Sequence, residues 1–313
     1  AAKEEAEKEV MQQLFEYVDL IENSMAIPVV AGKKTEKEKF AGADYTTTVE
    51  AFMPDGKALQ MATSHMLGQN FAKVFGIKFL DQNEKEAFAW QTSWGLSTRT
   101  IGAVVMVHGD DKGLVLPPKI APLQIVVVPI VFKENKENVI SKAKEVVKKL
   151  KLKNYTVHLD DRDGYTPGWK FNEWELKGVP LRIEIGPKDV EAEQLVLVRR
   201  DTNKKTIIKA NDLEAKVEHE LNDIQESLFK KAKNYLTKSI VEVHTMDELV
   251  KAIKNKKMPR AIFCGEVECE DHIKDKTEGA TCRCIPFEQK PAKGKCIQCG
   301  NEAKSWALFG KGY

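Results

Sequence analysis

All six cysteines of this 313-residue chain lie within its last 50 residues. They are Cys264, Cys269, Cys282, Cys284, Cys296 and Cys299. The outer pairs, C-x4-C and C-x2-C, have the spacing of ligand pairs that converge on one tetrahedral zinc ion, and Gly300 suits the tight turn of such a site. The middle pair and His272 are competing ligands. The alternative is six reduced cysteines packed as small hydrophobic residues. Because four bound thiolates leave no open position for substrate, we expect a structural metal.

Arg99 is a second candidate for chemistry, in the run Trp94–Gly102 at the junction of an expected strand and helix. Hydroxyl side chains flank it, and a guanidinium can bind phosphate oxygens through two parallel hydrogen bonds. A structural ion pair is the competing interpretation of such an arginine. The sequence contains no G-x-x-x-x-G-K-[ST] run, which excludes a P-loop nucleotide site.

Polar residues also gather at the end of an expected hairpin strand, in the run Gln60–His65. Because side chains alternate along a strand, we expect Thr63 and His65 to share one face and line one pocket, with Gln60 and Ser64 apart from them. A lone histidine is more often a core or capping residue than a catalytic one.

Aromatic and basic residues alternate in the segment 167–177, PGWKFNEWELK. Further basic residues follow at Arg182, Lys188, Arg199 and Arg200. This pattern suits stacking on nucleic-acid bases together with phosphate contacts, and carboxylates such as Glu175 and Asp189 can accept hydrogen bonds from base amino or imino groups. An amphipathic helix that packs its aromatic rings into a core explains the same pattern.

Composition narrows the class of protein. The chain holds 49 Lys and Arg against 47 Asp and Glu, a net charge of +2, so any nucleic-acid surface must be a local patch. No apolar run approaches the roughly 20 residues of a membrane span, and the charged, helical start lacks the apolar segment of a signal peptide. We therefore expect a cytoplasmic protein without a membrane partner.

Hydrophobic periodicity and turn residues predict three domains, at 1–115, 116–238 and 239–313. The first combines helices with an antiparallel sheet that contains a hairpin around Pro54-Asp55-Gly56, with helices expected at 1–25, 65–75 and 98–108 and strands at 26–32, 46–53, 57–63 and 86–94. The second is an α/β unit, with strands expected at 123–130, 155–159, 180–185 and 194–199 and helices at 138–151 and 212–236. The third begins with a capping box at Thr245 and holds the cysteines.

Several long stretches resemble prolyl-tRNA synthetases of the archaeal/eukaryotic-like type, class II enzymes with a C-terminal zinc-binding domain. The matching stretches are 40–51, 60–71, 94–102, 108–118, 167–189, 284–287 and 309–313. The resemblance runs essentially from end to end. It implies an α+β fold, with part of a class II antiparallel catalytic sheet, then an α/β anticodon-binding domain, then a small α/β zinc-binding domain.

The resemblance also implies roles for residues at matching positions. Arg99 would be the catalytic residue, holding the γ-phosphate of a bent ATP. The other ATP-binding residues would be Gln60, which also lies near a magnesium ion, Thr63 and Ser97. The proline pocket would contain His65, Trp94 and Gly95. The anticodon would be read by Phe171, Glu175, Arg182, Lys188 and Asp189. Zinc would be bound by Cys264, Cys269, Cys296 and Cys299, which leaves Cys282 and Cys284 as non-ligands. The terminal carboxylate of Tyr313 would reach back to the active site.

The implied activity is ATP-dependent attachment of L-proline to proline tRNA through prolyl-adenylate, with a structural Zn²⁺ and with Mg²⁺ bound to ATP. A homodimer is implied for the complete protein. Family members carry upstream a Thr-x-Glu loop that recognises proline, a dimer-forming first motif and a second motif with an ATP-binding arginine. We therefore expect this chain to be the rear part of the enzyme. Whether it is active by itself is left open. The alternative is a non-catalytic tRNA-binding module made of the anticodon and zinc domains.

Overall fold

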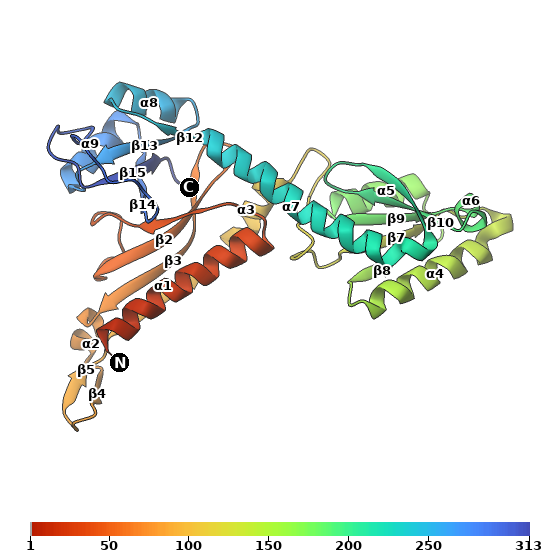
Figure 1. Ribbon diagram of the computed structural model, residues 1–313, viewed down its shortest axis with the longest axis horizontal. Helices are drawn as coiled ribbons and strands as arrows, with labels where there is room; N and C mark the ends of the chain where they lie inside the picture. The colour runs from red at the N-terminus through yellow and green to blue at the C-terminus, as the bar shows by residue number, and fades with distance from the viewer. Residues whose placement is uncertain (1) are drawn as a thin grey trace. The chain divides into compact units, whose positions relative to one another are not determined.

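The computed structural model describes residues 2–313, which divide into two compact units (Figure 1). The first unit contains residues 2–23, 27–103 and 233–313, and the second contains residues 24–26 and 104–232. Among the described residues, no helix combines the length and the apolar character that crossing a bilayer requires.

The first unit is built on one eight-stranded sheet, in the order β12-β13-β15-β14-β1-β2-β3-β6. The strands are β1 (Val30–Lys33), β2 (Tyr45–Phe52), β3 (Ala58–Gly68), β6 (Gln91–Leu96), β12 (Ile240–Glu242), β13 (Met258–Phe263), β14 (Thr281–Pro286) and β15 (Ser305–Gly310). All neighbours are antiparallel except β12 and β13. β1 approaches β14 closely because Gly32 has no side chain, and a Cβ there would lie 2.4 Å from the carbonyl oxygen of Ile285.

The pairing of β1 with β14 joins the segments expected as the first and third domains into a single sheet within one compact unit. The division into three domains at residues 115 and 238 remains a prediction from the sequence. The α+β architecture itself agrees with the expectation, since an antiparallel sheet with helices comes first and an α/β region follows.

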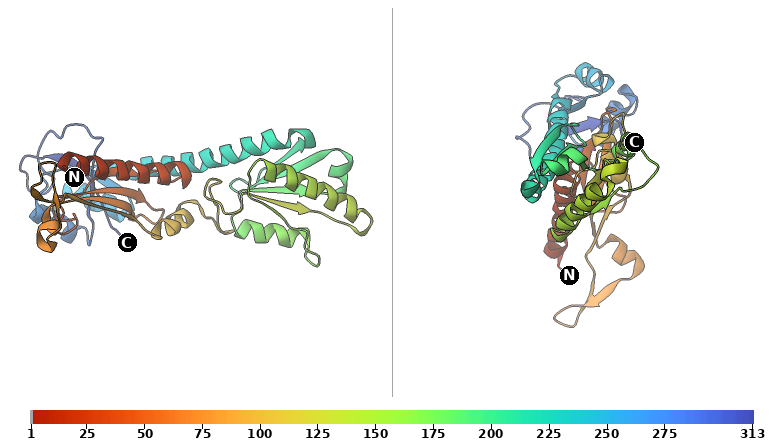
Figure 2. Two further views of the ribbon diagram at one scale, coloured as in Figure 1. Left: turned by 90° about the horizontal axis from the view of Figure 1, so that it is seen from below. Right: turned by 90° about the vertical axis from the view of Figure 1, so that its right-hand side faces the viewer.

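Helix α1 (Lys3–Asp19) covers one face of β2, β3 and β6 in the first unit (Figure 2). Its buried residues Ala6 and Val10 pack against Met66 of β3, which is fully buried. The other face of β3 carries Gln60, Thr63 and His65, which remain partly exposed. The helix therefore fixes which face of the sheet is left open for ligands.

Two expected elements differ in the first unit. The helix expected at 65–75 starts only at α2 (Asn70–Phe75), because residues up to Gly68 pair with both β2 and β6 and stay in the sheet. The strand expected at 86–94 is divided between β5 (Glu86–Phe88), which pairs with β4 (Lys78–Leu80) in a separate hairpin, and β6. Sheet hydrogen bonds formed across the fold override local helix preference in this region.

The second unit is an α/β sandwich whose sheet has the order β11-β10-β9-β7-β8. Its strands are β7 (Ile125–Pro129), β8 (Val157–Leu159), β9 (Leu181–Ile185), β10 (Gln194–Arg199) and β11 (Lys205–Lys209). β11 was not expected from the sequence, and it pairs with β10. The α-helices within this unit are α4 (Lys136–Leu152), α5 (Pro167–Leu176) and α6 (Pro187–Glu191), with the 3₁₀ helices η2 (Lys133–Asn135) and η3 (Ala210–Asp212). Three further helices have residues in both units, namely α3 (Arg99–His108), α7 (Leu213–Ser239) and the π-helix η1 (Leu20–Ser24).

Helices cover the two faces of this second sheet unequally. α4 and the first part of α7 bury one face, where Val146 and Val217 join the core around Val127. α5 covers part of the other face, with Trp174 packed on Val126 and Val128. Pro167 begins α5, and the Thr166 hydroxyl accepts a hydrogen bond from the Trp169 backbone N–H, as expected of a helix N-cap.

Two short helices complete the first unit, α8 (Met246–Lys254) and α9 (Val267–Lys276). The capping box expected at Thr245 is present, since its hydroxyl accepts a hydrogen bond from the Glu248 N–H at 3.2 Å.

Candidate functional site

A shallow cleft of about 250 Å³ lies over β3 and β6 in the first unit. Its lining consists of Gln60, Met61, Ala62, Thr63, Gly95, Leu96, Ser97 and Arg99. The cleft brings together the four residues expected at an ATP site, Gln60, Thr63, Ser97 and Arg99. It also includes Gly95, one of the residues expected around proline.

A β-bulge explains why Gln60 belongs to this cleft. Val49 of β2 pairs with Ala62, and the next residue, Glu50, pairs with Gln60, so that Met61 is an extra residue without a partner on β2. The extra residue reverses the alternation of side chains along β3. The expectation that Gln60 lies apart from Thr63 is therefore wrong, because it assumed a regular strand.

Arg99 is the first residue of α3, and its side chain is exposed at the edge of the cleft. Its Nη1 donates to the backbone carbonyl oxygen of Gln60 at 3.2 Å, and within residues 2–313 it forms no ion pair with a carboxylate. Ser97 helps to form the helix start, since its Oγ accepts from the Arg99 N–H at 3.4 Å and its carbonyl from the Thr100 hydroxyl at 3.0 Å. The guanidinium is therefore held near Gln60 with its charge available to an anion.

His65 lies further along β3, and a buried threonine fixes its ring. The hydroxyl of Thr46 lies 2.9 Å from His65 Nδ1 and accepts a hydrogen bond from the Phe40 backbone N–H at 2.9 Å. Since the Thr46 hydroxyl is buried and has no other acceptor among the described residues, its proton is donated to Nδ1. Burial lowers the pKa of His65. Both features favour a neutral ring with its proton on Nε2.

Strand pairing separates the other residues expected around proline. Gly95 pairs with Thr63 and lies on the cleft side, whereas Trp94 pairs with Ser64 and its side chain lies on the opposite face of the sheet. Ser93, which sequence reasoning missed, pairs with His65 and shares its face. Only the strand register distinguishes Ser93 from its neighbours.

Below the cleft, Glu50 is fully buried and has three polar partners. Its carboxylate accepts hydrogen bonds from Lys34 Nζ at 2.8 Å, the Thr48 hydroxyl at 2.7 Å and the Arg283 guanidinium at 3.0 Å. Arg283 belongs to β14, so this cluster links the C-terminal strands to the strand pair that carries Gln60. Residues so distant in sequence give no local signal, and sequence reasoning missed the cluster.

The C-terminal residues lie beside the same hairpin. The backbone N–H of Ala58, two residues before Gln60, donates to the Lys311 carbonyl oxygen at 2.8 Å. The Tyr313 hydroxyl donates to Asp55 Oδ1 at 2.7 Å, and the Lys57 ammonium lies 5.0 Å from the centre of the Tyr313 ring. The chain end is thus held at the turn that precedes the cleft strand.

Four cysteines of the first unit lie close together. Cys264 follows β13, Cys269 lies in α9, and Cys296 and Cys299 lie in the loop between β14 and β15. Their sulfur atoms all lie within 4.8 Å of one another, a group that could hold a metal ion. Cys299 is followed by Gly300, whose φ of 74° is the left-handed conformation expected for a tight turn at the site.

The other candidate ligands lie outside this cluster. Cys282 and Cys284 are fully buried on β14, and the Cys282 N–H donates to Glu270 at 3.0 Å. His272 is exposed on α9. Among the described residues, the group that could hold a metal ion consists of the four cysteines with C-x4-C and C-x2-C spacing. The donor set fits zinc, because an edge of about 3.8 Å separates the sulfurs of a tetrahedral site and Cys264 and Cys299 are 3.9 Å apart.

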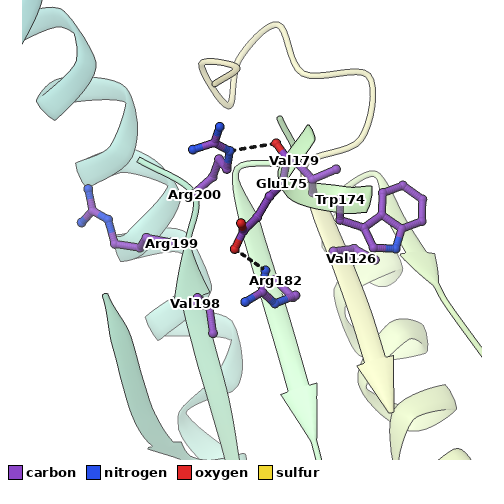
Figure 3. Close-up of a pocket in the computed structure, with 8 residues that line it drawn as sticks. All are labelled: Val126, Trp174, Glu175, Val179, Arg182, Val198, Arg199 and Arg200. Carbon is purple, nitrogen blue, oxygen red and sulfur yellow. Dashed lines mark hydrogen bonds and ion pairs between the residues drawn. The ribbon is translucent and has the colours of Figure 1, made fainter. Parts of the chain in front are cut away.

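In the second unit, the guanidinium of Arg182 on β9 contacts three side chains. It pairs with Glu175 Oε1 at 3.4 Å (Figure 3). It also pairs with Glu184 Oε1 at 3.0 Å and lies 4.2 Å from the centre of the Phe171 ring. Phe171 and Glu175 are one helical turn apart on the same flank of α5. An aromatic ring, a carboxylate and a guanidinium therefore converge beside the part of the sheet that α5 leaves uncovered.

Lys188 and Asp189, the other residues expected to read the anticodon, differ in their hydrogen bonds within the chain. Lys188 is exposed on α6. Asp189 caps that helix, with Oδ2 accepting from the Gly186 N–H and Oδ1 from Gln194 Nε2, each at 2.9 Å. Both oxygens therefore have structural partners.

Arg199 and Arg200 line the small pocket of Figure 3 but are neutralised by carboxylates. Arg199 pairs with Asp201, Glu220 and Asp223, and Arg200 pairs with Asp110. The hydrogen bond from Arg200 lowers the pKa of Asp110 to about 2. These two arginines are structural.

Comparison with known proteins agrees with this arrangement. Residues 2–108 match the model of the class II tRNA synthetase core domain (G, H, P, S and T), residues 124–220 the anticodon binding domain, and residues 246–313 the C-terminal domain of prolyl-tRNA synthetase. The chain belongs to the prolyl-tRNA synthetase family. The three family models match in the order in which the sequence predicted the corresponding domains.

Relatives named proline–tRNA ligase match along almost the whole chain. The protein from Natranaerobius thermophilus is 51% identical over 99% of this chain, and that from Ruminiclostridium cellulolyticum is 51% identical over 100% of it. One from Clostridium botulinum (strain Loch Maree) is 50% identical over 99%. The chain spans 64–65% of the length of these three relatives.

Proposed function

We propose that this chain is part of an enzyme that attaches L-proline to proline tRNA at the expense of ATP. The observation that carries the proposal is the cleft in which Gln60, Thr63, Ser97 and Arg99 come together. A module that only bound tRNA would not need a cleft of this kind beside an arginine that forms no ion pair with any carboxylate of residues 2–313. The ligase function is therefore preferred over the non-catalytic alternative.

In the first step, an oxygen of the proline carboxylate attacks the α-phosphorus of ATP, and the bond to pyrophosphate breaks. Arg99 would bind the γ-phosphate and stabilise the charge on the leaving group, while Gln60, Thr63 and Ser97 orient the nucleotide. Phosphoryl transfer depends mainly on such positioning and charge stabilisation. In the second step, a terminal ribose hydroxyl of the tRNA attacks the prolyl carbonyl and AMP leaves.

His65 and Gly95 lie where they can line the proline pocket next to that cleft. The neutral His65 ring carries its proton on Nε2, so it would donate a hydrogen bond to an oxygen of the bound amino acid. The side chain of Trp94 lies on the other face of the sheet by register, so Trp94 would contribute to the wall of the pocket through its backbone in β6. The carboxylate of Tyr313 is proposed to act from the hairpin turn before β3.

Two metals belong to the proposal. Cys264, Cys269, Cys296 and Cys299 would hold a structural Zn²⁺, which stabilises the fold of the loops that supply them. The cleft lining offers amide and hydroxyl oxygens but no carboxylate, so the described residues form no Mg²⁺ site of their own. Mg²⁺ would enter with the phosphates of ATP.

The second unit is proposed to read the anticodon. Proline anticodons end in two guanines, whose N1–H and N2–H groups are donors. Glu175 would accept from these donors, Arg182 would donate to base acceptors, and Phe171 would stack on a base. Lys188 would contact phosphate. Asp189 would accept a further hydrogen bond from a base, since each of its oxygens has one partner within the chain and can accept a second.

The cellular setting follows from the same proposal. We place the reaction in the cytoplasm, where clustered thiolates remain reduced. We also propose a homodimer for the complete protein, an inference that rests on the family alone and that sedimentation of the complete protein tests.

Proline-dependent exchange of labelled pyrophosphate into ATP tests the catalytic part. In the complete protein, we expect exchange with proline and a loss of at least a hundredfold in Arg99→Ala. Arg260→Ala serves as a control, because Arg260 lies on β13 outside the cleft, where it pairs with Glu242. Exchange that is independent of proline, or unchanged in Arg99→Ala, contradicts the assignment. A complete protein that binds proline tRNA but shows no exchange in the presence of proline supports the non-catalytic alternative instead.

A further inference from the structure

Helix α5 carries a second aromatic cluster on the flank opposite to Phe171 and Glu175. Tyr165, in the loop before the helix, stacks on Trp169, with 4.2 Å between ring centroids and 29° between the ring planes. Tyr165 is 47% exposed and Trp169 is 45% exposed. Large aromatic surfaces exposed to this extent at the start of a well-packed helix remain available to a ligand.

A guanidinium completes the cluster. Arg162 lies 5.0 Å from the centre of the Tyr165 ring and 5.4 Å from that of Trp169. Its Nε and Nη2 each donate to the carboxylate of Asp160 at 2.8 Å, and Nη2 also pairs with Glu173. The planar side chain is thus fixed in one orientation beside the two rings.

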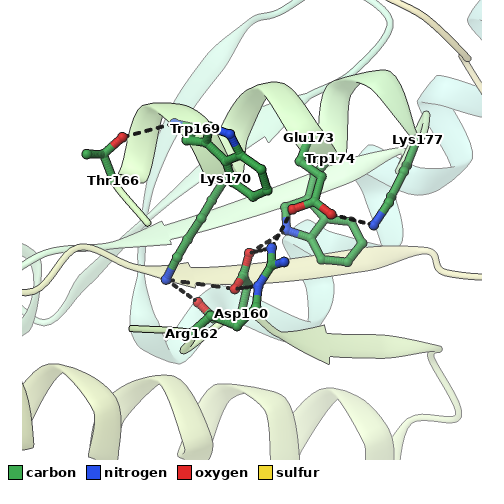
Figure 4. Close-up of polar contacts among 8 residues, drawn as sticks. All are labelled: Asp160, Arg162, Thr166, Trp169, Lys170, Glu173, Trp174 and Lys177. Carbon is green, nitrogen blue, oxygen red and sulfur yellow. Dashed lines mark hydrogen bonds and ion pairs between the residues drawn. The ribbon is translucent and has the colours of Figure 1, made fainter. Parts of the chain in front are cut away.

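Asp160 anchors this arrangement from below (Figure 4). It is fully buried, accepts a hydrogen bond from Trp174 Nε1 at 2.8 Å, and its backbone carbonyl accepts from Lys170 Nζ at 3.0 Å. Burial alone would raise its pKa, but the hydrogen bonds from Arg162 and Trp174 keep the pKa well below the usual range. The cluster therefore stays ionised and rigid, so that little conformational entropy is lost when a ligand binds.

The chemistry of the cluster favours a flat, uncharged ligand. Asp160 and Glu173 neutralise Arg162, which weakens any attraction to a free phosphate. Exposed aromatic rings and guanidinium planes are the surfaces on which unpaired RNA bases stack. The other flank of α5 repeats this combination in Phe171 and Arg182, within the surface proposed to read the anticodon. The flanks of one helix are about 10 Å apart, a distance that a few nucleotides of one loop can cross.

We propose that Arg162, Tyr165 and Trp169 form a stacking platform for one unpaired base of the bound tRNA. The proposal rests on the proposed function, and it adds a contact outside the set formed by Phe171, Glu175 and Arg182. Because every base has a π-face, the platform accepts any base. It contributes affinity and holds the loop open, while sequence discrimination stays with the other flank.

Fluorescence anisotropy of the whole chain with a labelled anticodon stem-loop of proline tRNA tests the platform. We expect Trp169→Ala to weaken binding about tenfold, the loss typical of one base–aromatic stack. Trp169→Phe keeps a ring and should bind within about twofold of the wild type. Phe132→Ala is the matched control, because Phe132 is an exposed aromatic residue of the same unit outside the platform and should leave affinity unchanged. Tyr165→Ala supplies a second variant, and thermal unfolding checks that all variants fold.

Abasic substitutions in the RNA loop identify the stacked base. At one position, the abasic RNA should bind the wild type about tenfold more weakly, yet bind Trp169→Ala as well as the intact RNA does. Wild-type affinity in both Trp169→Ala and Tyr165→Ala overturns the platform while anticodon reading stands. An equal loss in Phe132→Ala, or additive losses at every abasic position, overturns it as well. If the wild-type chain binds no proline stem-loop, the proposed function fails and the platform fails with it.

Discussion

Replacing Cys299 by serine tests the metal centre with the least damage to the fold. Cys299 is the exposed member of the cluster, whereas its three partners are buried, so its loss leaves no cavity in the core. The Sγ atoms of Cys299 and Cys264 are 3.9 Å apart, close to the edge of about 3.8 Å in a tetrahedral zinc–thiolate site. The cluster is therefore already arranged for a metal ion.

The expected loss follows from the strength of such sites. Structural zinc binds with about 10–16 kcal/mol in zinc-finger peptides, so one of four ligands is worth about 3 kcal/mol. That difference corresponds to about a hundredfold weaker binding. This value assumes that the ligand is lost completely, so it is an upper bound if the serine oxygen still contacts the metal weakly.

Metal content measured by mass spectrometry after dialysis against a chelator provides the assay. We expect close to one zinc per wild-type chain and almost none in Cys299→Ser, together with faster proteolysis of the loop between β14 and β15. Cys284→Ser is the control, since Cys284 is buried on β14 outside the cluster and should keep its zinc. Full zinc content in Cys299→Ser, or equal loss in both variants, would refute the assignment.

Three further predictions concern protonation and recognition. Burial lowers the pKa of His108 to about 4, although its ring donates to the Met25 carbonyl. The stability it contributes is therefore complete above about pH 6.5 and is lost as pH falls toward 4, by about 3 kcal/mol. The free energy of unfolding, measured with urea at a series of pH values, should fall in this way in the wild type but not in His108→Gln. The same dependence on pH in both proteins would contradict the role of His108. Thr46→Val should release the His65 ring into a mixture of tautomers in ¹H–¹⁵N NMR spectra, and an unchanged single tautomer would disprove the bridging role of the hydroxyl. Glu175→Gln should weaken binding of a loop with two guanines about tenfold and reduce its preference over adenine, so unchanged discrimination would exclude this carboxylate as a guanine reader.

Short-range patterns in the sequence predicted much of this fold. The cysteine spacing, the capping box at Thr245 and the hairpin around Pro54-Asp55-Gly56 each depend on neighbouring residues, and each has the expected structure. For the aromatic segment 167–177, the alternative of a helix that packs its rings into a core holds for one tryptophan and fails for the other. Trp174 is buried in the core of the second unit, whereas Trp169 is exposed.

What the sequence could not supply depends on contacts between distant segments. The bulge at Met61 is defined by pairing with β2, and it moves Gln60 to the cleft side. The pairing of β1 with β14 connects strands from opposite ends of the chain. Asp189 caps α6 through one carboxylate oxygen and accepts from Gln194 through the other, contacts that its spacing alone does not predict. Sheet register and hydrogen-bond competition decide these cases, and neither follows from local spacing.

We propose that this chain takes part in charging proline tRNA, and recognition of the anticodon tests that proposal most directly. The affinity of the whole chain should be measured for proline tRNA and for the same tRNA with its last two anticodon guanines replaced by adenines. The interactions proposed for Glu175 and Arg182 predict that the changed tRNA binds at least thirtyfold more weakly, since each correct base contact is worth about 1–3 kcal/mol. Equal affinity for the two tRNAs would contradict the account.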